Sequence, residues 1–438
     1  MAMPARRLFR RARPQYRVRG ARAGALALGV AGVASLAGLA GCGAKPAVDP
    51  SHALPMPSSH HASPRTAHAT HGAQAAVPKP ADPAPATASC PATVLSAMTE
   101  AQRIGQLFLV GLPGNEVAGS VATTITAHHY GSAIFGANST GGVAGARAVS
   151  SAVQALATGP ATARVRFFVA ANQEGGQVQA LKGPGISSIP SALAQGSAHV
   201  STLRKLATVW GQQLRAAGVN LNLAPVMDVV PAGTDQQNAP IGALEREYGH
   251  DPATVSSHGV AFLNGMASAG VATSAKHFPG LGRVRGNTDF TSSVVDSSTT
   301  ASAAYLQTYQ AAINAGVPLV MVALATYTRI DSRDLAVFSP TIVRGLLRQK
   351  LHFRGTIISD DMGAAAAVAG MSPGTRAVDF VAAGGDLITT ESLPVANAMD
   401  AALLAKAGTD AGFRAQVNAA ALQVLTTKQK YGLLPCSR

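Results

Sequence analysis

Several polar clusters each come directly after a short apolar run of the chain. They are Asn172-Gln173-Glu174, Asp228, Lys276-His277 and Ser359-Asp360-Asp361. Carboxylates and imidazoles can attack an electrophilic carbon or transfer protons, and Lys or Arg can bind dense groups of oxygen atoms. The clusters lie far apart in the sequence, so this chemistry requires a fold that brings them together.

Eight apolar runs bounded by Gly, Pro or polar turns predict β-strands, with amphipathic helices between them. Helical spacing of apolar residues is clear in segments such as 202–217, 300–315 and 339–350. Alternating strands and helices indicate parallel pairing, and eight repeats favour a single-domain (β/α)8 barrel of the TIM type, an α/β fold. A doubly wound open sheet is the alternative. The strands are expected near residues 106–111, 131–135, 165–171, 220–224, 271–275, 317–323, 356–359 and 386–389.

The polar clusters follow the predicted third, fourth, fifth and seventh strands. In a β/α barrel the active site lies at the carboxyl ends of the strands. We therefore expect the four clusters to converge on one face and to form a site.

The first 42 residues are typical of an export signal. Eight Arg residues and no acidic residue lie between Met1 and Gly24, and an uncharged run from Ala23 to Gly41 follows. The Leu-Ala-Gly sequence before Cys42 resembles a bacterial lipoprotein signal, so we expect lipidation of Cys42 and anchoring at the outer face of the cytoplasmic membrane or the cell wall. A retained transmembrane helix is the alternative, and the export route stays open.

Residues 43–89 are predicted to form an extended, disordered stalk. They hold nine of the 26 prolines and five of the 12 His residues, without apolar periodicity. Residues 90–438 would then form the catalytic domain. Cys90 and Cys436 bracket this domain, and in an oxidising compartment they are expected to form a disulfide, with two free thiols as the alternative.

The net charge of +14 is concentrated at the N-terminus. Residues 1–24 contribute +8 and residues 43–89 contribute +1, which leaves +5 from Cys90 onward. No basic run with interleaved aromatic residues occurs in the main domain, which argues against a nucleic-acid partner. The Gly pairs 141–142 and 384–385 lack phosphate-loop spacing. We expect no cofactor, no metal site and a monomer.

Five sequence blocks resemble glycoside hydrolase family 3, specifically its single-domain β-N-acetylglucosaminidases. The resemblance implies a carbohydrate substrate and retaining hydrolysis through a covalent glycosyl-enzyme, which needs a carboxylate nucleophile and a proton donor. The blocks occur in family order along residues 90–438, and they are 172–179 (NQEGGQVQ), 222–230 (NLAPVMDVV), 241–252 (IGALEREYGHDP), 276–282 (KHFPGLG) and 358–362 (ISDDM).

The resemblance implies that Asp360 is the nucleophile, because it directly follows Ser359 at the end of the seventh strand. Asp361 would face away or orient the loop. The alternative is that Asp360 is a helix N-cap, since it precedes the Ala-rich run 363–369.

The resemblance also implies that Asn172, Arg246, Lys276 and His277 bind the substrate. Structural ion pairing is the alternative for Lys276 and Arg246, and a core position is the alternative for His277. Asp228 would either bind the substrate or brace Lys276.

The proton donor departs from the family pattern. Family members usually carry Asp-Ser-His at an offset from Lys-His-Phe-Pro-Gly that corresponds here to Asn287-Thr288-Asp289, so Asp289 stands in the position of the donor. An Asp with its ordinary pKa of about 3.9 is a poor acid at neutral pH. Burial or the charge of Asp360 would have to raise the pKa of Asp289. Glu174 is a second candidate, although the two glycines after it suggest that it holds a turn.

We therefore expect a retaining exo-β-N-acetylglucosaminidase that acts on peptidoglycan fragments. Asn172 and Leu281 replace residues that the family commonly has, Asp and His respectively, so a β-glucosidase or β-xylosidase stays open. A sugar-binding lipoprotein without turnover is the remaining alternative, because the Asp-Ser-His motif is missing.

Overall fold

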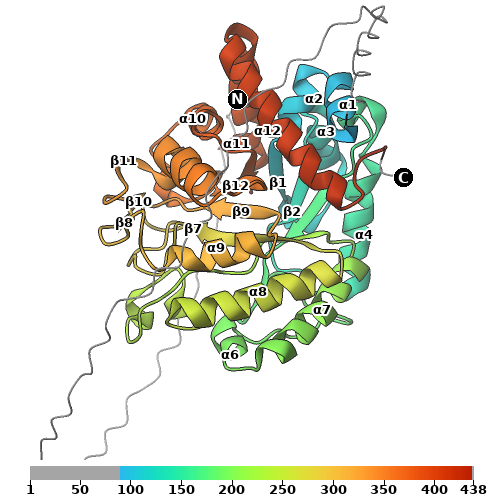
Figure 1. Cartoon of the computed structure of the whole chain (residues 1–438). Helices are drawn as coiled ribbons and strands as arrows, with labels where there is room; N and C mark the ends of the chain where they lie inside the picture. Colours follow the sequence, from blue (N-terminus) through green and yellow to red (C-terminus); the bar gives the residue numbers. More distant parts are fainter. Residues whose placement is uncertain (1–88, 437–438) are drawn as a thin grey trace, which may run out of the picture. The chain divides into compact units, whose positions relative to one another are not determined.

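The computed structural model describes residues 89–436, and within them eight parallel strands close into a barrel (Figure 1). The order around the barrel is β1-β13-β12-β9-β7-β6-β3-β2. This confirms the (β/α)8 barrel, and each strand overlaps one of the eight predicted runs. The signal segment, Cys42 and the stalk up to residue 88 lie outside the described residues. The barrel strands are β1 (Phe108–Leu112), β2 (Ser132–Phe135), β3 (Phe168–Ala171), β6 (Leu221–Asn222), β7 (Ala272–Phe278), β9 (Leu319–Val322), β12 (Thr356–Asp361) and β13 (Leu387–Thr390).

Helices surround the barrel, and α7 packs along α8 (Figure 1). The predicted segments 202–217 and 339–350 correspond to α7 and η5. The segment 300–315 is helical only from Leu306, because residues before it form isolated turns such as Ala303 N to Thr300 O at 3.0 Å. The barrel helices are α3 (Gly119–Ala127), α4 (Gly142–Ala155), α7 (Val200–Ala216), α8 (Pro252–Ser268), α9 (Leu306–Asn314), η5 (Thr341–Lys350), α10 (Pro373–Ala383) and α11 (Leu393–Thr409).

Apolar side chains fill the barrel and the layer between barrel and helices. Alternate residues of each strand point to opposite faces, so one set lines the barrel axis and the other packs under the helices. Ile358 belongs to the axial set and its neighbour Ile357 to the helix-facing set. The axial set includes Leu109, Ile134, Phe168, Ala170, Leu221, Leu223, Ala272, Leu319, Met321, Ile358 and Leu387.

The two ends of the described chain meet at the amino-terminal side of the barrel. Helix α1 (Cys90–Ala97) packs against α12 (Ala411–Lys430), and α2 (Glu100–Gly105) follows α1. Cys90 and Cys436 form a disulfide with a Cα–Cα distance of 6.0 Å across a sequence separation of 346 residues. The predicted bridge is therefore confirmed. Under the barrel, the buried Lys428 donates to Gln106 Oε1 at 2.8 Å and to the carbonyl of Gly131 at 2.7 Å.

Short elements extend the carboxyl ends of the barrel strands. The hairpin of β4 (Gln173–Gly175) and β5 (Val178–Gln179) follows β3. A small sheet of β8 (Val295–Asp296), β10 (Thr326–Tyr327) and β11 (Asp331–Leu335) is built from the loops after β7 and β9. Of these elements, the hairpin contributes Val178 to the lining of a cavity at this end of the barrel. The other short helices are α5 (Gly159–Thr162), α6 (Ala192–Gly196), η1 (Pro113–Asn115), η2 (Asp235–Gln237), η3 (Gly242–Leu244), η4 (Ala336–Phe338) and η6 (Ala366–Val368).

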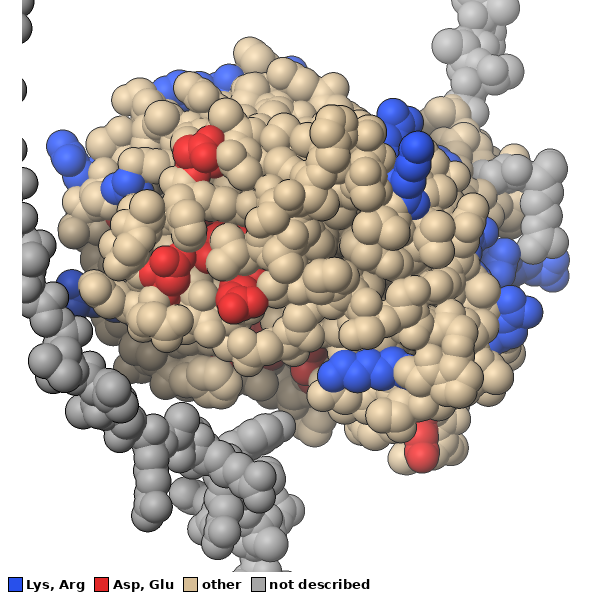
Figure 2. All heavy atoms as spheres, turned by 90° about the horizontal axis from the view of Figure 1, so that it is seen from below, with Lys and Arg blue, Asp and Glu red and all other residues tan. Residues whose placement is uncertain are grey.

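Charged side chains are sparse on the face drawn in Figure 2, where acidic and basic groups stand in small separate patches. Among residues 89–436, no helix has both the length and the apolar character needed to cross a bilayer.

Candidate active site

A cavity of about 490 Å³ lies at the carboxyl ends of the barrel strands. Its volume falls in the range of small-molecule sites. Its floor is the last axial layer of the barrel, with Ile134, Leu223 and Met321. Its polar lining comes from widely separated parts of the sequence and consists of Asn172, Arg246, Lys276, His277, Asn287, Thr288, Asp289, Asp360, Asp361, Thr389 and Glu391. Three of the four predicted clusters, those after β3, β7 and β12, therefore contribute side chains to one cavity, whereas Asp228 does not line it.

Strand alternation explains why three of these side chains face the cavity. Ala170, Ala272 and Ile358 point to the barrel axis. Residues an even number of positions further along a strand share its face. Asn172 follows Ala170, Lys276 follows Ala272 and Asp360 follows Ile358 in this way, and all three line the cavity.

Asp360 lies at the end of β12 with its carboxylate in the cavity. Its single side-chain hydrogen bond within residues 89–436 is the one that Oδ1 accepts from the backbone N of Asp361, at 2.9 Å. Within the described residues, no backbone N–H group at the start of a helix donates a hydrogen bond to the Asp360 carboxylate. The carboxylate therefore has unused oxygen lone pairs at the cavity.

Asp361, rather than Asp360, holds the loop after β12. Its Oδ1 accepts from the backbone N of Gly363 at 2.8 Å and from that of Glu391 at 3.0 Å, and its Oδ2 accepts from Ala364 at 3.1 Å. A Cβ atom on Gly363 would lie 2.3 Å from Thr390 Oγ1, so this close turn requires glycine. The capping function considered for Asp360 thus belongs to its neighbour.

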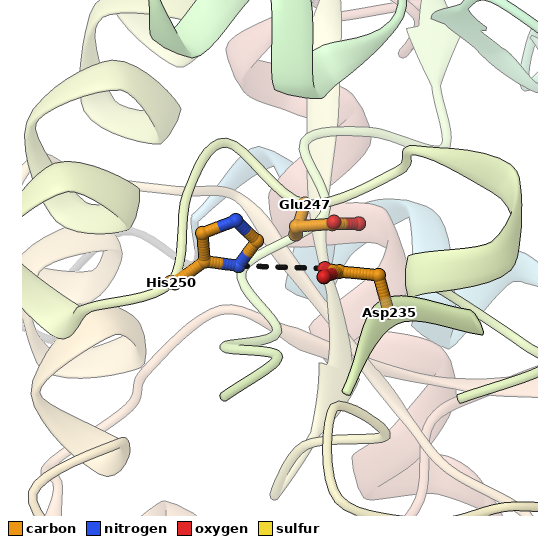
Figure 3. Close-up of side chains that lie close together, drawn as sticks. All are labelled: Asp235, Glu247 and His250. Carbon is orange, nitrogen blue, oxygen red and sulfur yellow. Dashed lines mark ion pairs between the residues drawn. The ribbon is translucent and has the colours of Figure 1, made fainter. Parts of the chain in front are cut away.

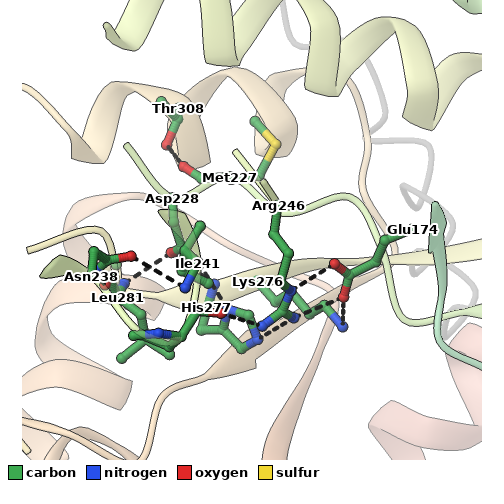
Figure 4. Close-up of polar contacts among 12 residues, drawn as sticks. Glu174, Met227, Asp228, Asn238, Ile241, Arg246, Lys276, His277, Leu281 and Thr308 are labelled. Carbon is green, nitrogen blue, oxygen red and sulfur yellow. Dashed lines mark hydrogen bonds and ion pairs between the residues drawn. The ribbon is translucent and has the colours of Figure 1, made fainter. Parts of the chain in front are cut away.

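A buried charge cluster forms one wall of the cavity (Figure 4). Glu174 accepts two hydrogen bonds from Arg246, both 2.8 Å long, and lies 2.7 Å from Lys276 Nζ. Lys276 also donates to Asn172 Oδ1 at 2.9 Å. Burial by itself raises the pKa of Glu174, but the charges of Arg246 and Lys276 outweigh it and lower the pKa to about 2. Glu174 is therefore an ionised carboxylate that orients two cations, and it is unsuited to donate a proton.

Asp228 lies behind the cavity and holds His277 (Figure 4). Its Oδ2 is 2.8 Å from His277 Nδ1, while its Oδ1 accepts from the backbone N of His277, the backbone N of Leu281 and the hydroxyl of Tyr309. The Asp228 side chain has no exposed surface. The expectation that Asp228 binds the substrate or braces Lys276 is therefore corrected, because its oxygens are taken up by other donors and it does not reach the cavity.

The segment that carries Asp289 lies against the loop after β12. The backbone N atoms of Ala366 and Ala367 donate to the carbonyls of Asp289 and Thr288, at 3.2 and 3.0 Å. Asn287 Oδ1 accepts from the backbone N of Asp289 at 2.9 Å, so it shapes the turn and does not orient the carboxyl group.

The pKa of Asp289 is raised above its ordinary value. Partial desolvation at the cavity is the larger cause, and the negative charge of Asp360 adds to it. Both effects favour the protonated carboxyl group, and they act against the charges of Arg246 and His277, which lower the pKa.

Glu391 is a site residue that the sequence reasoning missed. It follows β13, lines the cavity, and its pKa is raised to about 7 by desolvation and by the charges of Asp361, Asp289 and Asp360. Its position directly after the predicted eighth strand is the same signal that selected the clusters after the other strands.

Comparisons with known proteins agree with this geometry. The model of the glycosyl hydrolase family 3 N terminal domain matches residues 99–427. A beta-hexosaminidase of Stenotrophomonas maltophilia (strain K279a) is 32% identical over 226 residues, which are 50% of this chain and 63% of that protein. A beta-N-acetylglucosaminidase/beta-glucosidase of Cellulomonas fimi is 31% identical over 306 residues, 67% of this chain and 51% of that protein. The chain thus spans less than two thirds of either relative.

A solved structure extends the likeness to the whole barrel. The beta-N-acetylhexosaminidase from Beutenbergia cavernae is 46% identical, with a TM-score of 0.74. The superposition covers 76% of this chain and 98% of that protein. The fold of the barrel is therefore shared along nearly the full length of that neighbour.

Proposed function

Because the chain belongs to glycoside hydrolase family 3, we propose that it is a retaining exo-β-N-acetylglucosaminidase with Asp360 as its nucleophile. One observation carries this proposal. The Asp360 carboxylate lines the cavity with unused lone pairs, together with Asn172 after β3, Lys276 and His277 of β7, and Arg246 of the loop after β6.

In the proposed first step, Asp360 attacks the anomeric carbon and the bond to the leaving oxygen breaks. A proton donor on the other side of that bond protonates the leaving oxygen. In the second step the same group, now a base, takes a proton from water, and the water oxygen displaces Asp360. The positive charges of Arg246 and Lys276 line the same cavity and favour substrates rich in oxygen atoms.

Asp289 is the proposed proton donor. It lines the cavity with Asp360, and its raised pKa favours the protonated form that the first step needs. Glu174 is discarded for this function because Arg246 and Lys276 keep it ionised.

A β-glucosidase activity is the second candidate. It is favoured by the combined name of the Cellulomonas fimi relative and by Leu281, which lines the cavity where the resemblance leads us to expect His. Asn172 supports it too, since an amide stands where the resemblance leads us to expect Asp.

We further propose that the enzyme is an exported lipoprotein, anchored through Cys42, that acts on peptidoglycan fragments. The Leu-Ala-Gly-Cys sequence supports the anchor. The Cys90–Cys436 disulfide supports export, because such bridges persist in oxidising compartments.

The test uses the full chain and a panel of nitrophenyl β-glycosides. We expect release from the N-acetyl-β-glucosaminide, little release from the glucoside and xyloside, and loss of activity in Asp360→Asn. Asp334→Asn is the matched control, because Asp334 is an exposed Asp outside the cavity. A slow fluorinated N-acetylglucosaminide should label Asp360 in wild-type protein. Equal release by wild type and Asp360→Asn would refute the nucleophile, and binding without hydrolysis of any glycoside would support the sugar-binding alternative.

A further inference from the structure

A second cluster of ionisable side chains lies outside the cavity (Figure 3). Asp235 begins η2, whereas Glu247 and His250 lie on the segment between η3 and α8. Each residue has one side-chain atom of a type that binds metal ions, a carboxylate oxygen or an imidazole nitrogen. These atoms all lie within 4.8 Å of one another. None of the three lines the active-site cavity.

Glu247 is the unusual member of this cluster. It has 0% of its surface exposed, and neither carboxylate oxygen has a hydrogen-bond partner within residues 89–436. A buried carboxylate without a donor is costly, because the lost hydration is not replaced. Burial and the neighbouring Asp235 raise the pKa of Glu247 to about 7. A proton or a metal cation held between the two carboxyl groups would offset this cost.

His250 lies beside the carboxyl groups of Asp235 and Glu247, and this side of the cluster is partly open to solvent. Its Nδ1 lies 3.4 Å from Asp235 Oδ1, and the side chains of His250 and Asp235 keep 35% and 27% of their surface exposed. Figure 3 shows the three groups turned toward one another, with Glu247 and Asp235 side by side. The buried floor and the partly open side would allow an ion to enter from solvent and retain water ligands.

We propose that Asp235, Glu247 and His250 bind a divalent cation that accepts both nitrogen and oxygen ligands, such as Zn²⁺ or Mn²⁺. Three protein ligands with one imidazole suit such ions, whereas Ca²⁺ and Mg²⁺ prefer sites made of oxygen atoms alone. The ion would take the place of a proton shared by the two carboxyl groups. His250 would bind through Nδ1 with its proton on Nε2, giving up the 3.2 Å contact of Nδ1 with the carbonyl of Val230.

The position of the site gives the ion a structural consequence. Glu247 directly follows Arg246, which binds Glu174 in the cavity wall. Asp235 and Glu247 both belong to the connection between β6 and α8, so the ion would cross-link two parts of the loop that carries Arg246. We infer that it stabilises the placement of Arg246 without touching the substrate.

The experiment measures metal binding directly and does not depend on glycosidase activity. Full-chain protein is treated with a chelator, freed of it, and titrated calorimetrically with Zn²⁺, Mn²⁺, Mg²⁺ and Ca²⁺. Because the stalk contains His60 and His61, the same titration is done in a His60→Ala/His61→Ala background. We expect one Zn²⁺ or Mn²⁺ per chain in that background, with weaker binding of Mg²⁺ and Ca²⁺.

Three variants test the ligands. Glu247→Gln, Asp235→Asn and His250→Gln should each weaken binding by more than about 10-fold, since even residues that only orient a ligand contribute that much. Glu245→Gln is the matched control, because Glu245 is an exposed acid in the same segment, and it should bind as wild type does. If Glu247→Gln does not fold, Asp235→Asn serves at a partly exposed position.

Thermal unfolding separates the cation from a shared proton. If the site binds a cation, Zn²⁺ or Mn²⁺ raises the Tm of wild type and of Glu245→Gln but not that of Glu247→Gln. If the two carboxyl groups share a proton instead, the metal ions leave the wild-type Tm unchanged, and Glu247→Gln unfolds at the same temperature as wild type or at a higher one. The same number of ions and the same affinity in wild type and Glu247→Gln would overturn the proposal.

Discussion

Asp228 contacts His277 through both of its carboxylate oxygens. One carboxylate oxygen lies 2.8 Å from Nδ1 of the ring, and the other accepts the backbone N–H of the same residue at 3.0 Å. The ring is thereby fixed in position with its Nε2 turned toward Arg246, 3.4 Å from Nη2. A buried carboxylate with no path to the substrate thus decides where a cavity side chain points.

Asp228→Asn should therefore harm both stability and activity. The amide leaves at least one of four donors unpaired in a buried place, which should cost about 2–3 kcal/mol in the free energy of unfolding. Activity should fall mainly through misplacement of His277. Tyr309→Phe is the control, since it removes only the hydroxyl that donates to Asp228. Denaturant unfolding and steady-state kinetics measure both effects, and equal losses in the two variants would contradict this account.

Glu174 predicts an acid-dependent loss of stability. Its folded-state pKa of about 2 lies below the ordinary 4.5, so its contribution is fully present above about pH 4.5. As the pH falls from there toward 2, the unfolded state takes up the proton first and the contribution, about 3 kcal/mol, is lost. Glu174→Gln should remove this dependence and destabilise the protein at pH 7 by about 3–5 kcal/mol, because Arg246 and Lys276 lose their buried counter-charge. Glu116 is exposed, so Glu116→Gln should change neither the pH dependence nor the stability at pH 7. Unfolding curves from pH 3 to 7 provide the measurement.

The proton donor can be identified from leaving-group dependence. Asp289→Asn should slow glycosides with poor leaving groups by about 100-fold or more while sparing activated aryl glycosides. It should also abolish the alkaline limb of kcat/KM, which reports deprotonation of the donor. The raised pKa of Asp289 places that limb above the ordinary range of an Asp.

Glu391→Gln tests whether Asp289 or Glu391 donates the proton. Asp289 raises the pKa of Glu391, whereas the pKa of Asp289 is raised by burial and by Asp360, so this variant should leave the alkaline limb in place with a modest loss of rate. A leaving-group dependence in Glu391→Gln like that predicted for Asp289→Asn would assign proton donation to Glu391 instead.

Breaking the Cys90–Cys436 bridge should lower stability without changing the chemistry. The bridge closes a loop of 346 residues far from the cavity, and its loss should cost about 2–4 kcal/mol. Cys436→Ser should therefore lower the Tm and leave kcat/KM of the folded enzyme unchanged. An unchanged Tm in this variant, compared with wild type in the absence of reductant, would show that the bridge does not contribute.

Much of the fold was predictable because it depends on local patterns. Each strand is a short apolar run, and each intervening helix has an apolar face, so the eight repeats are visible in the sequence. Strand alternation then predicts which side chain points to the axis, as it does for Asp360 two residues beyond Ile358. The start of α9 was placed too early because residues 300–305 are apolar enough to continue a helix but form separate turns.

The functions of the carboxylates could not be derived in this way. Burial and charge partners set whether a carboxyl group is ionised, and those partners come from other parts of the chain. Glu174 and Asp289 were both candidates as proton donors in the sequence, and only their neighbours distinguish them. Arg246, 72 residues away, holds one as an anion, while Asp360, 71 residues away, raises the pKa of the other.

The sequence by itself determined the barrel and the face that carries the site, because strand periodicity and chain order are local properties. It left Cys90 and Cys436 as either a bridge or two free thiols. Only the tertiary structure decided that Asp361 holds the loop while Asp360 is free, that Asp228 supports His277 from behind, and that Glu247 lies buried beside Asp235. The physical reason is that hydrogen-bond partners and desolvation depend on distances between segments, which no local pattern encodes.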